Sequence, residues 1–454
     1  MLLDIRGGIT ADGNQHGGCG RFGGSGHRPR LSTDGRITVG EGADPSSASA
    51  GTASRNGPSA SSHATGTQTG APSTTQQVRS TPKAAPSVPT TATTTTRATP
   101  TIVPPVATVS SEPALSSSGL SPVQPITVRV AKGTITEVTL TNPTGYQVKG
   151  LLSADRSSWT TAEVLGFGRK YTLAGTAVGN DGKSVPIIGS YTMVRPKNEV
   201  RTTISPGDRA VVGVAMPIVV KFAVEPRDRA LIEKNVKVTT VPRVQGAWGW
   251  IQHDEGEWGL DYRPKGYWPS GTKVHVEANL YGLEFAPGAY GKTSLSSDFT
   301  IGRNQVVAAD AKAHKIVVTR NGKVVASYNA SFGSVNDDRE TRSGIHVVND
   351  KFADKIMVSE KFHYREREKW AVRISNNGEF IHANPKTIDV QGRQNVSHGC
   401  INLSDADARA YFTGAMVGDP VEVTGTGVRL GPQDGDIFDY AIPWSEWVTL
   451  SALG

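Results

Sequence analysis

The sequence predicts a mainly β protein, with two β-sandwich modules followed by a β-rich domain that contains one clear helix. Short runs of alternating apolar and polar residues recur from about residue 125 to residue 302, with turn residues between them. After residue 302, two Asn-Gly pairs separate further runs of the same kind. A chain of 454 residues is also too long for one ordinary domain, which favours several modules.

Residues 1–124 are rich in Ser, Thr, Pro and Gly, and this composition predicts that the segment is disordered. Phe22 is the only aromatic residue before Tyr146, so the segment cannot bury enough apolar surface to offset chain entropy. We expect it to act as a stalk or linker. The first residues show no apolar stretch typical of a signal peptide, so neither a targeting segment nor a membrane anchor is visible.

The first sandwich module is expected over residues 125–201 and the second over residues 202–302. Strands are predicted at 126–130, 135–140, 171–175 and 187–194, and then at 219–224, 236–241, 248–252, 258–262 and 274–279. Six aromatic residues gather in the second module: Trp248, Trp250, Trp258, Tyr262, Tyr267 and Trp268. A glycan-binding surface is one interpretation, and we prefer a sandwich core with a packing face against the next domain.

The third domain is expected over residues 303–424, followed by a C-terminal subdomain over residues 425–454. Asn321-Gly322 predicts a tight hairpin between strands at 315–320 and 323–328, and Asn377-Gly378 predicts another between 370–374 and 379–382. Ser404 is a candidate N-cap of a helix that we expect Gly418 to close, before a last strand at 420–424.

The formal net charge of +7 favours an anionic partner. Nucleic acid and cell wall are both compatible with that charge. The basic residues form no long runs and no nucleic-acid-binding motif is visible, so we expect no nucleic-acid partner. Two cysteines in so long a chain exclude a disulfide framework.

Cys400 is the residue on which the functional interpretation depends. The other cysteine, Cys19, lies in the segment expected to be disordered, so Cys400 is either a small buried hydrophobe or a reactive thiol. Gly399 permits a sharp turn and close approach of a substrate. His398 and His382 supply candidate bases, which a thiol needs to become a thiolate near neutral pH.

The pattern around Cys400 resembles the signature of the L,D-transpeptidases, whose catalytic domain is of the YkuD type and which cross-link bacterial peptidoglycan. The residues that carry the resemblance are His382, then a spacer of fourteen residues from 383 to 396, then Ser397, His398, Gly399, Cys400 and Asn402. The resemblance implies an actinobacterial or mycobacterial type of architecture, in which two immunoglobulin-like domains precede the catalytic domain and a C-terminal subdomain packs against it.

The resemblance also implies roles for individual residues. Cys400 is the expected nucleophile and His382 the base, oriented by the backbone carbonyl of Ala383. Donors to the oxyanion are expected from the backbone N–H groups of Gly399 and Cys400 and from the Tyr364 hydroxyl. Residues expected to bind substrate or support the site are Ser397, His398, Asn402, Met357 and Trp370.

The implied reaction is two-step acyl transfer without a cofactor or metal. The Cys400 thiolate takes the acyl group of a tetrapeptide stem, D-Ala leaves, and the amine of a second stem forms a 3→3 cross-link. The expected partners are peptidoglycan stem peptides, with carbapenem β-lactams as covalent inhibitors. The alternatives are an L,D-carboxypeptidase, attachment of a protein to peptidoglycan by the same thioester, and a non-enzymatic wall-binding module.

The implied location is outside the cytoplasm, in the cell wall or periplasmic space, with the chain tethered to the membrane. Because no signal peptide is visible, this expectation requires either a different start site or an export signal that the sequence does not reveal. His346 is expected to be structural. His253, His275, His314 and His363 lack metal-ligand spacing, and zinc at His398 and Cys400 would need further ligands.

Overall fold

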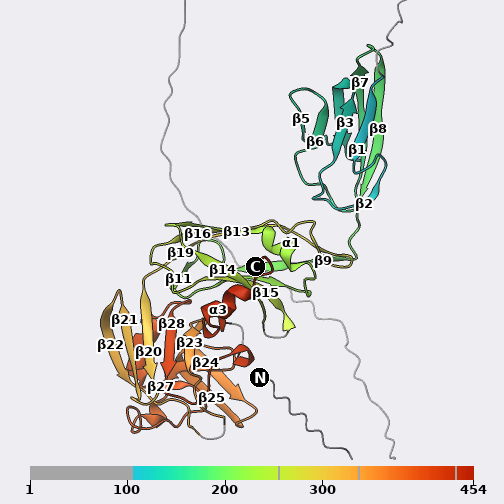
Figure 1. The fold of residues 1–454 in the computed structure, drawn as a ribbon. Coiled ribbons are helices and arrows are strands. Elements are labelled where there is room, and N and C mark those ends of the chain that lie inside the picture. The colour runs from blue at the N-terminus through green and yellow to red at the C-terminus, as the bar shows by residue number, and fades with distance from the viewer. Residues whose placement is uncertain (1–105, 254–255, 336–337, 435–436) are drawn as a thin grey trace, which may run out of the picture. The chain divides into compact units, whose positions relative to one another are not determined.

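The computed structural model describes residues 106–253, 256–335, 338–434 and 437–454, and Figure 1 shows the strands that dominate them. The mainly β fold class is confirmed. The expectation for residues 1–105 lies outside the described residues. Within the described ranges, no helix combines the length and apolar character that a membrane span requires.

The first module is a sandwich of two four-stranded sheets, ordered β1-β3-β6-β5 and β2-β8-β7-β4. Its strands are β1 (Thr108–Glu112), β2 (Ser118–Leu120), β3 (Thr127–Ala131), β4 (Gly133–Thr141), β5 (Gly150–Leu152), β6 (Ser158–Thr161), β7 (Lys170–Gly179) and β8 (Ser184–Met193). Alternating inward residues such as Val128, Leu173 and Tyr191 form its core. This alternation is the pattern from which the strands were predicted.

The boundary expected at residue 124 lies too far along the chain. Strand β1 pairs antiparallel with β3 along its whole length, from Thr108 to Glu112, and Ala107 is buried in the core of this module. A strand made of Thr, Val, Ser and Glu has few apolar residues, so its composition matches that of the preceding Ser/Thr-rich segment. Its stability comes from pairing at the sheet edge.

The second module contains two four-stranded sheets, β10-β12-β15-β14 and β11-β19-β16-β13, and a small sheet β17-β18-β9. Its strands are β9 (Asn198–Val200), β10 (Thr202–Ser205), β11 (Val211–Val212), β12 (Ile218–Phe222), β13 (Val236–Val241), β14 (Gly246–Gln252), β15 (Trp258–Pro264), β16 (Lys273–Ala278), β17 (Glu284–Ala286), β18 (Ala289–Gly291) and β19 (Leu295–Ile301). Helix α1 (Arg229–Lys234) precedes β13. Because β9 pairs with β18, this module begins before the expected residue 202.

The aromatic residues of the second module serve packing. Trp250, Tyr262 and Trp268 are buried in its core. The Tyr267 ring lies 5.5 Å from that of Tyr440, and its hydroxyl donates to Glu422 of the third domain at 2.7 Å. The interpretation as a sandwich core with a packing face is therefore confirmed for these residues.

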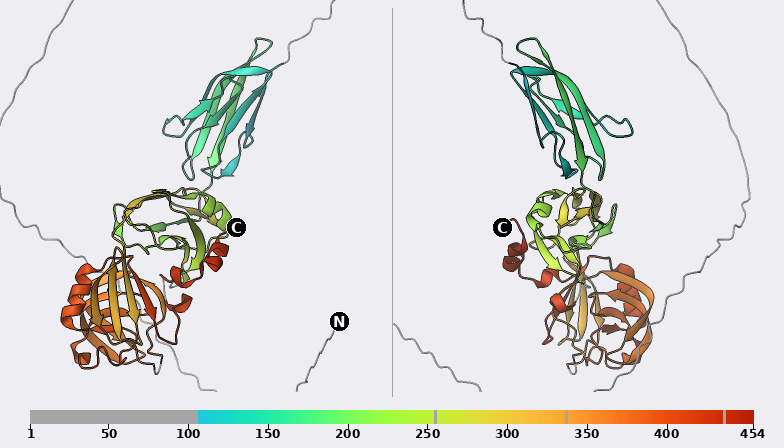
Figure 2. Two further views of the ribbon diagram at one scale, coloured as in Figure 1. Left: turned by 60° about the vertical axis from the view of Figure 1, so that its left-hand side comes forward. Right: turned by 90° about the vertical axis from the view of Figure 1, so that its right-hand side faces the viewer.

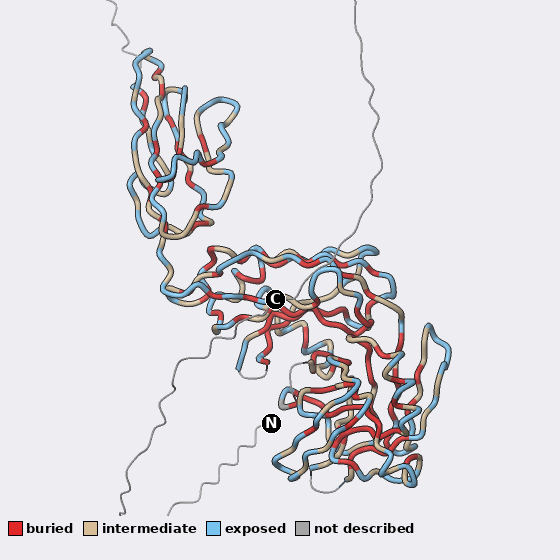
Figure 3. Tube along the Cα trace, turned by 180° about the vertical axis from the view of Figure 1, so that it is seen from behind, coloured by how far each residue is buried: buried red, intermediate tan, exposed pale blue. Residues whose placement is uncertain are grey.

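The third domain places a core between a five-stranded sheet, β22-β21-β20-β28-β23, and a four-stranded sheet, β24-β25-β26-β27. The strands are β20 (Gln305–Asp310), β21 (Lys315–Arg320), β22 (Lys323–Asn329), β23 (Gly344–Val347), β24 (Asp350–Ser359), β25 (Tyr364–Arg373), β26 (Phe380–Ala383), β27 (Ile401–Leu403) and β28 (Pro420–Thr424). Figure 2 shows this domain in yellow, orange and red, and Figure 3 shows that its strands carry long buried stretches. Residues from both sheets, among them Ile316, Ile381 and Leu403, share one cluster.

Helix α2 (Asp405–Gly414) directly follows β27, and the predicted N-cap is confirmed. The Ser404 side chain accepts a hydrogen bond from the Asp407 N–H, and Asp405 and Asp407 lie in the first turn. The helix ends at Gly414, four residues before the expected Gly418. Ala408 and Tyr411 are its buried residues, so this short helix covers the core beside the strand that leads out of the nucleophile loop.

The two Asn-Gly pairs adopt different structures. Asn321 and Gly322 both have positive φ, 48° and 75°, as a tight type I′ hairpin turn requires. At the second pair only Gly378 is left-handed, with φ 100°, and strands β25 and β26 first pair at Arg373 and Phe380. The predicted hairpin is therefore confirmed, but its tight type I′ turn is wrong, because residues 375–378 form a longer loop closed by the Ile374 N–H bond to the Glu379 carbonyl at 3.0 Å.

The C-terminal segment returns to the second module. It contains the single-turn helices η3 (Pro432–Asp434), η4 (Asp439–Ala441), α3 (Trp444–Trp447) and η5 (Val448–Leu450). The fully buried Trp447 donates its indole N–H to the Ala247 carbonyl at 3.0 Å. The Arg263 guanidinium lies over the Tyr440 and Trp447 rings at 4.8 and 4.6 Å. Aromatic packing thus fixes this segment on β14 and β15.

Candidate active site

A cavity of about 210 Å³ opens in the third domain, where the β24-β25 hairpin meets the nucleophile loop, residues 396–400, which enters β27. Its lining combines the predicted nucleophile and base with residues that sequence reasoning did not name. The lining residues are Met357, Tyr364, Glu366, Glu368, His382, Asn384, Lys386, Thr387, Val396, Ser397, His398, Cys400 and Asn402. The fold therefore brings His382 and Cys400 to one concave surface.

Cys400 lies at the floor of this cavity and is 7% exposed. It belongs to a small apolar cluster with Met357, Ala371 and Phe380, against which the Tyr364 ring also packs. Its Sγ lies 3.5 Å from the Gly378 carbonyl oxygen. The β25-β26 loop therefore contacts the thiol on one side, and the cavity borders it on another.

His382 is the group best placed to act on that thiol. It is buried on β26, and its Nδ1 donates a hydrogen bond to the Ala383 carbonyl at 2.9 Å. Because a carbonyl oxygen can only accept, Nδ1 carries a proton and Nε2 is left for Cys400. Burial disfavours the imidazolium, but the hydrogen bonds and charges of Cys400 and Glu368 outweigh burial and raise the pKa of His382 to about 10.

Glu368 was missed in the sequence analysis. Its Oε2 lies 3.4 Å from His382 Nδ1, and its side chain is nearly buried. Along β25 the inward positions alternate through Tyr364, Glu366 and Glu368, which is the signal that indicates one shared face. Glu366 pairs with Lys386 at 3.0 Å on the same cavity wall. His382 thus has the Glu368 carboxylate on one side and the Cys400 thiol on the other.

The nucleophile loop is fixed by its own hydrogen bonds. Gly399 has φ +123°, a conformation that other residues rarely adopt, whereas a Cβ there would meet nothing closer than 3.5 Å. The Ser397 hydroxyl donates to the Cys400 carbonyl and accepts from the Gly399 N–H at 3.2 Å. Gly399 was predicted as an oxyanion donor, but its N–H already points at Ser397. The Cys400 N–H is therefore the stronger backbone candidate.

The β24-β25 hairpin forms a short flap over the cavity. Met357 and Tyr364 lie on its two strands, and Tyr364 pairs with Ser359 next to the turn. Burial and the nearby charges of Cys400, Glu366 and Glu368 raise the pKa of Tyr364 to about 12, so its hydroxyl keeps its proton at neutral pH. The His398 ring packs against Phe362 and Tyr364, at 4.9 and 5.3 Å, and supports the flap.

Of the two remaining residues predicted to support the site, Asn402 lines the cavity and Trp370 does not. Trp370 lies away from the cavity, with its ring 5.6 Å from Phe412 and its indole N–H bonded to Asp405 of α2. Asn402 lines the cavity, and its buried Oδ1 has no hydrogen-bond partner among the described residues. Its backbone exchanges two hydrogen bonds with Ser331, so it also ties the loop to the core.

The other histidines do not join the site. His346 is fully buried and its Nε2 faces the Arg342 carbonyl at 2.8 Å, which fits the structural role expected for it. His275 contacts Asp298, and His314 contacts Asn395. Within the described part of the chain, no group of three or more His, Cys, Asp or Glu side chains is arranged to hold a metal ion.

The chain matches two family models. Residues 304–423 match the L,D-transpeptidase catalytic domain, YkuD, and residues 117–284 match a bacterial Ig domain. This defines the class: a YkuD-type catalytic domain that follows immunoglobulin-like modules.

Relatives extend the match beyond single domains. L,D-transpeptidase 5 of Mycobacterium tuberculosis is 44% identical over 352 residues, which cover 77% of this chain and 78% of that protein. L,D-transpeptidase 2 of the same species is 36% identical over 338 residues, 72% of this chain and 81% of that protein. A solved structure of the L,D-transpeptidase LdtMt1 in complex with imipenem is 31% identical, has a TM-score of 0.42, and covers 50% of this chain and 100% of that chain. The identity and coverage of the two mycobacterial relatives show that the chain belongs to the L,D-transpeptidase family.

Proposed function

We propose that the chain forms 3→3 cross-links between peptidoglycan stem peptides through a thioester on Cys400. Membership of the family supports transpeptidation of peptidoglycan in general. The observation that carries the finer proposal is the placement of the Cys400 thiol beside His382, whose Nδ1 is fixed by Ala383 so that Nε2 serves the thiol. A flap residue, Tyr364, lines the same cavity.

In the first step the Cys400 thiolate, whose proton His382 already holds, attacks the carbonyl between the third stem residue and D-Ala. The oxyanion that develops is stabilised by the Cys400 N–H and the Tyr364 hydroxyl. The C–N bond then breaks, and His382 gives the proton to the departing amine of D-Ala. A thioester between the stem and Cys400 remains.

In the second step the side-chain amine of another stem attacks the thioester carbonyl. His382 takes the proton that the amine loses, the C–S bond breaks, and the sulfur leaves as the thiolate. The product is an amide that joins the two stems, and the enzyme returns to its starting state. Glu368 stabilises the imidazolium form of His382 in both steps through the contact at 3.4 Å.

A strained lactam carbonyl suits the same nucleophile and the same donors, so a carbapenem should acylate Cys400. Because its target is peptidoglycan, we place the enzyme outside the cytoplasm, tethered to the membrane by the N-terminal part of the chain.

The deciding experiment incubates the full chain with a disaccharide tetrapeptide and identifies the products by mass spectrometry. A dimer that has lost one D-Ala supports the proposal, and Cys400→Ala should form none. A tripeptide monomer as the only product would instead identify an L,D-carboxypeptidase, in which water replaces the acceptor amine. Transfer of the stem only to an added protein would identify an anchoring enzyme.

A further inference from the structure

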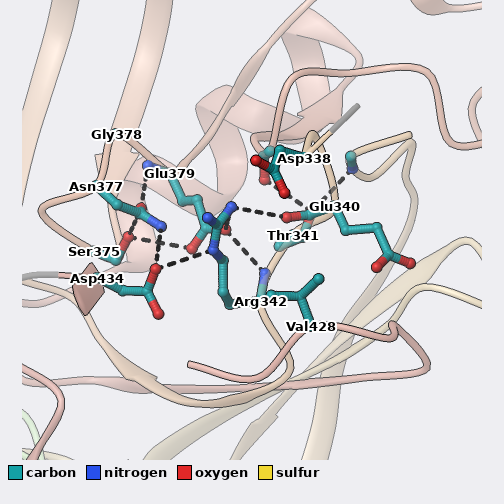
Figure 4. Close-up of polar contacts among 12 residues, drawn as sticks. Asp338, Glu340, Thr341, Arg342, Ser375, Asn377, Gly378, Glu379, Val428 and Asp434 are labelled. Carbon is teal, nitrogen blue, oxygen red and sulfur yellow. Dashed lines mark hydrogen bonds and ion pairs between the residues drawn. The ribbon is translucent and has the colours of Figure 1, made fainter. Parts of the chain in front are cut away.

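Behind the nucleophile loop lies a buried polar network that the reaction described above does not use. Figure 4 shows its centre, where Arg342 lies between Glu379 and Asp434. The Arg342 Nε donates to Asp434 Oδ1 at 3.0 Å, and the Arg342 backbone N–H donates to Glu379 Oε1 at 2.9 Å. Glu379 is 2% exposed. The network therefore fixes the backbone of residues 341 and 342 against the loop between β25 and β26.

Thr341, the residue before Arg342, connects this network to the nucleophile loop by a hydrogen bond. It is fully buried, and its hydroxyl donates to the Gly399 carbonyl oxygen at 2.8 Å. The same hydroxyl oxygen accepts a hydrogen bond from the Gly333 N–H at 2.9 Å. Because both bonds are satisfied in one geometry, the hydroxyl has a fixed direction.

The Gly399 carbonyl and the Cys400 N–H belong to the same peptide group. In a planar trans peptide these two bonds point in opposite directions. A hydroxyl that holds the carbonyl oxygen on the buried side therefore turns the Cys400 N–H towards the other side. Gly399 has no side chain to restrict this peptide and has φ +123°, so an external hydrogen bond is needed to fix it.

From these contacts we propose that Thr341 is a positioning residue that orients the Cys400 N–H as the backbone donor to the oxyanion. The proposal rests on the function proposed above, in which Cys400 is acylated. It gives Thr341 no contact with substrate. The Ser397 hydroxyl fixes the peptide on the other side of Gly399 by accepting from the Gly399 N–H, so of the N–H groups of Gly399 and Cys400 only that of Cys400 is left for the oxyanion.

The test compares two reactions of the same sulfur in the full chain. Acylation by imipenem develops an oxyanion, whereas alkylation by iodoacetamide does not. Removal of one oxyanion donor typically slows acyl transfer by about 10²–10³-fold, so a misdirected donor in Thr341→Val should slow acylation by about tenfold or more. Alkylation of Cys400 should stay within about twofold of the wild type. Thr341→Ser, which keeps the hydroxyl, should restore acylation.

A matched control is Thr272→Val in the second module. Thr272 is also fully buried and donates to a backbone carbonyl, that of Pro269, at 2.7 Å. This variant should lose a comparable hydrogen bond and leave both reactions unchanged. If Thr341→Val does not fold, Thr341→Ala and Thr341→Ser provide the same contrast.

Equal slowing of acylation and alkylation, or acylation at the wild-type rate without the hydroxyl, would overturn the role of Thr341. So would slow acylation in Thr341→Ser with normal alkylation. A wild-type chain that imipenem does not acylate at Cys400 would instead contradict the proposed function. The two failures are therefore distinguishable by the mass of the wild-type protein alone.

Discussion

The Gly378 carbonyl oxygen lies 3.5 Å from the Sγ atom of Cys400. Gly378 follows Asn377, whose N–H donates to the Asp434 carbonyl at 3.1 Å and whose side-chain amide donates to Asp434 Oδ1 at 3.2 Å. The loop below the thiol is thus anchored by the C-terminal segment. The nucleophile is positioned from two directions, by this loop and by the Thr341 contact to Gly399.

Replacement of the nucleophile should abolish the reaction and spare the fold. Cys400 fills a small apolar cluster, and alanine there removes little volume, so Cys400→Ala should unfold close to the wild-type temperature. It should form no cross-linked dimer and no carbapenem adduct by intact-protein mass spectrometry. Cys19→Ala is the control and should leave turnover unchanged. Cross-linking by the Cys400 variant would refute the assignment.

The charge on His382 should make the thiol reactive at low pH. The pKa of His382 is raised to about 10, so the ring stays cationic below that pH and stabilises a thiolate beside it. An ordinary thiol with a pKa of about 8.5 reacts slowly at neutral pH. Alkylation of wild-type Cys400 by iodoacetamide should therefore persist well below pH 8, and His382→Ala should remove this low-pH reactivity.

Glu368 should contribute to that charge. Its carboxylate is one of the causes that raise the pKa of His382, so Glu368→Gln should lower that pKa and reduce alkylation several-fold at pH 6–7. Glu360→Gln, an exposed change in the flap turn, is the matched control. Identical pH profiles for wild type and Glu368→Gln would show that the contact at 3.4 Å carries no charge coupling.

Loss of the Tyr364 hydroxyl should slow acylation of Cys400 but not its alkylation. Its pKa is raised to about 12, so the hydroxyl keeps its proton and can donate at neutral and mildly alkaline pH. Tyr364→Phe should slow acylation by imipenem by about 10²-fold, the usual effect of losing one oxyanion donor. Stopped-flow acylation measures this, with iodoacetamide alkylation as the internal control. Parallel loss of both rates would indicate that the ring only shapes the flap.

Sequence reasoning reached the strands, the helix cap and the Cys400–His382 pair because each depends on local pattern or fixed spacing. It did not identify Glu368, because an acidic residue in an alternating strand is expected on the solvent-exposed face. Only the tertiary structure shows that this face of β25 packs against His382. Arg342 and Asp434 are 92 residues apart, and no local pattern connects them. Strand β1 was missed because its composition is that of a linker, and only its pairing with β3 reveals it.

The Arg342–Asp434 pair should contribute to stability. Asp434 is buried, and Arg342 is about one-fifth exposed at 22%, so removing the carboxylate leaves a largely buried charge without this partner. Asp434→Ala should lower the free energy of unfolding by about 1–3 kcal/mol, measured by urea denaturation. Asp389→Ala, at an exposed position, should change it little. An unchanged midpoint for Asp434→Ala would argue against an anchoring role.

The path of the C-terminal segment has a consequence for choosing cloning boundaries. A fragment ending at residue 424, where the last strand of the catalytic sheet stops, would keep Cys400, His382 and the whole cavity lining. It would nevertheless lose the contact of Asp434 with Asn377 in the loop beneath the thiol, and the hydrogen bond from Trp447 to Ala247. Ser451 and Ala452 bond to Glu233 of the second module, so the anchoring continues almost to the last residue. A fragment from strand β9 to Gly454 retains all of these contacts, whereas one that ends at residue 424 would be a poor reagent for inhibitor screening.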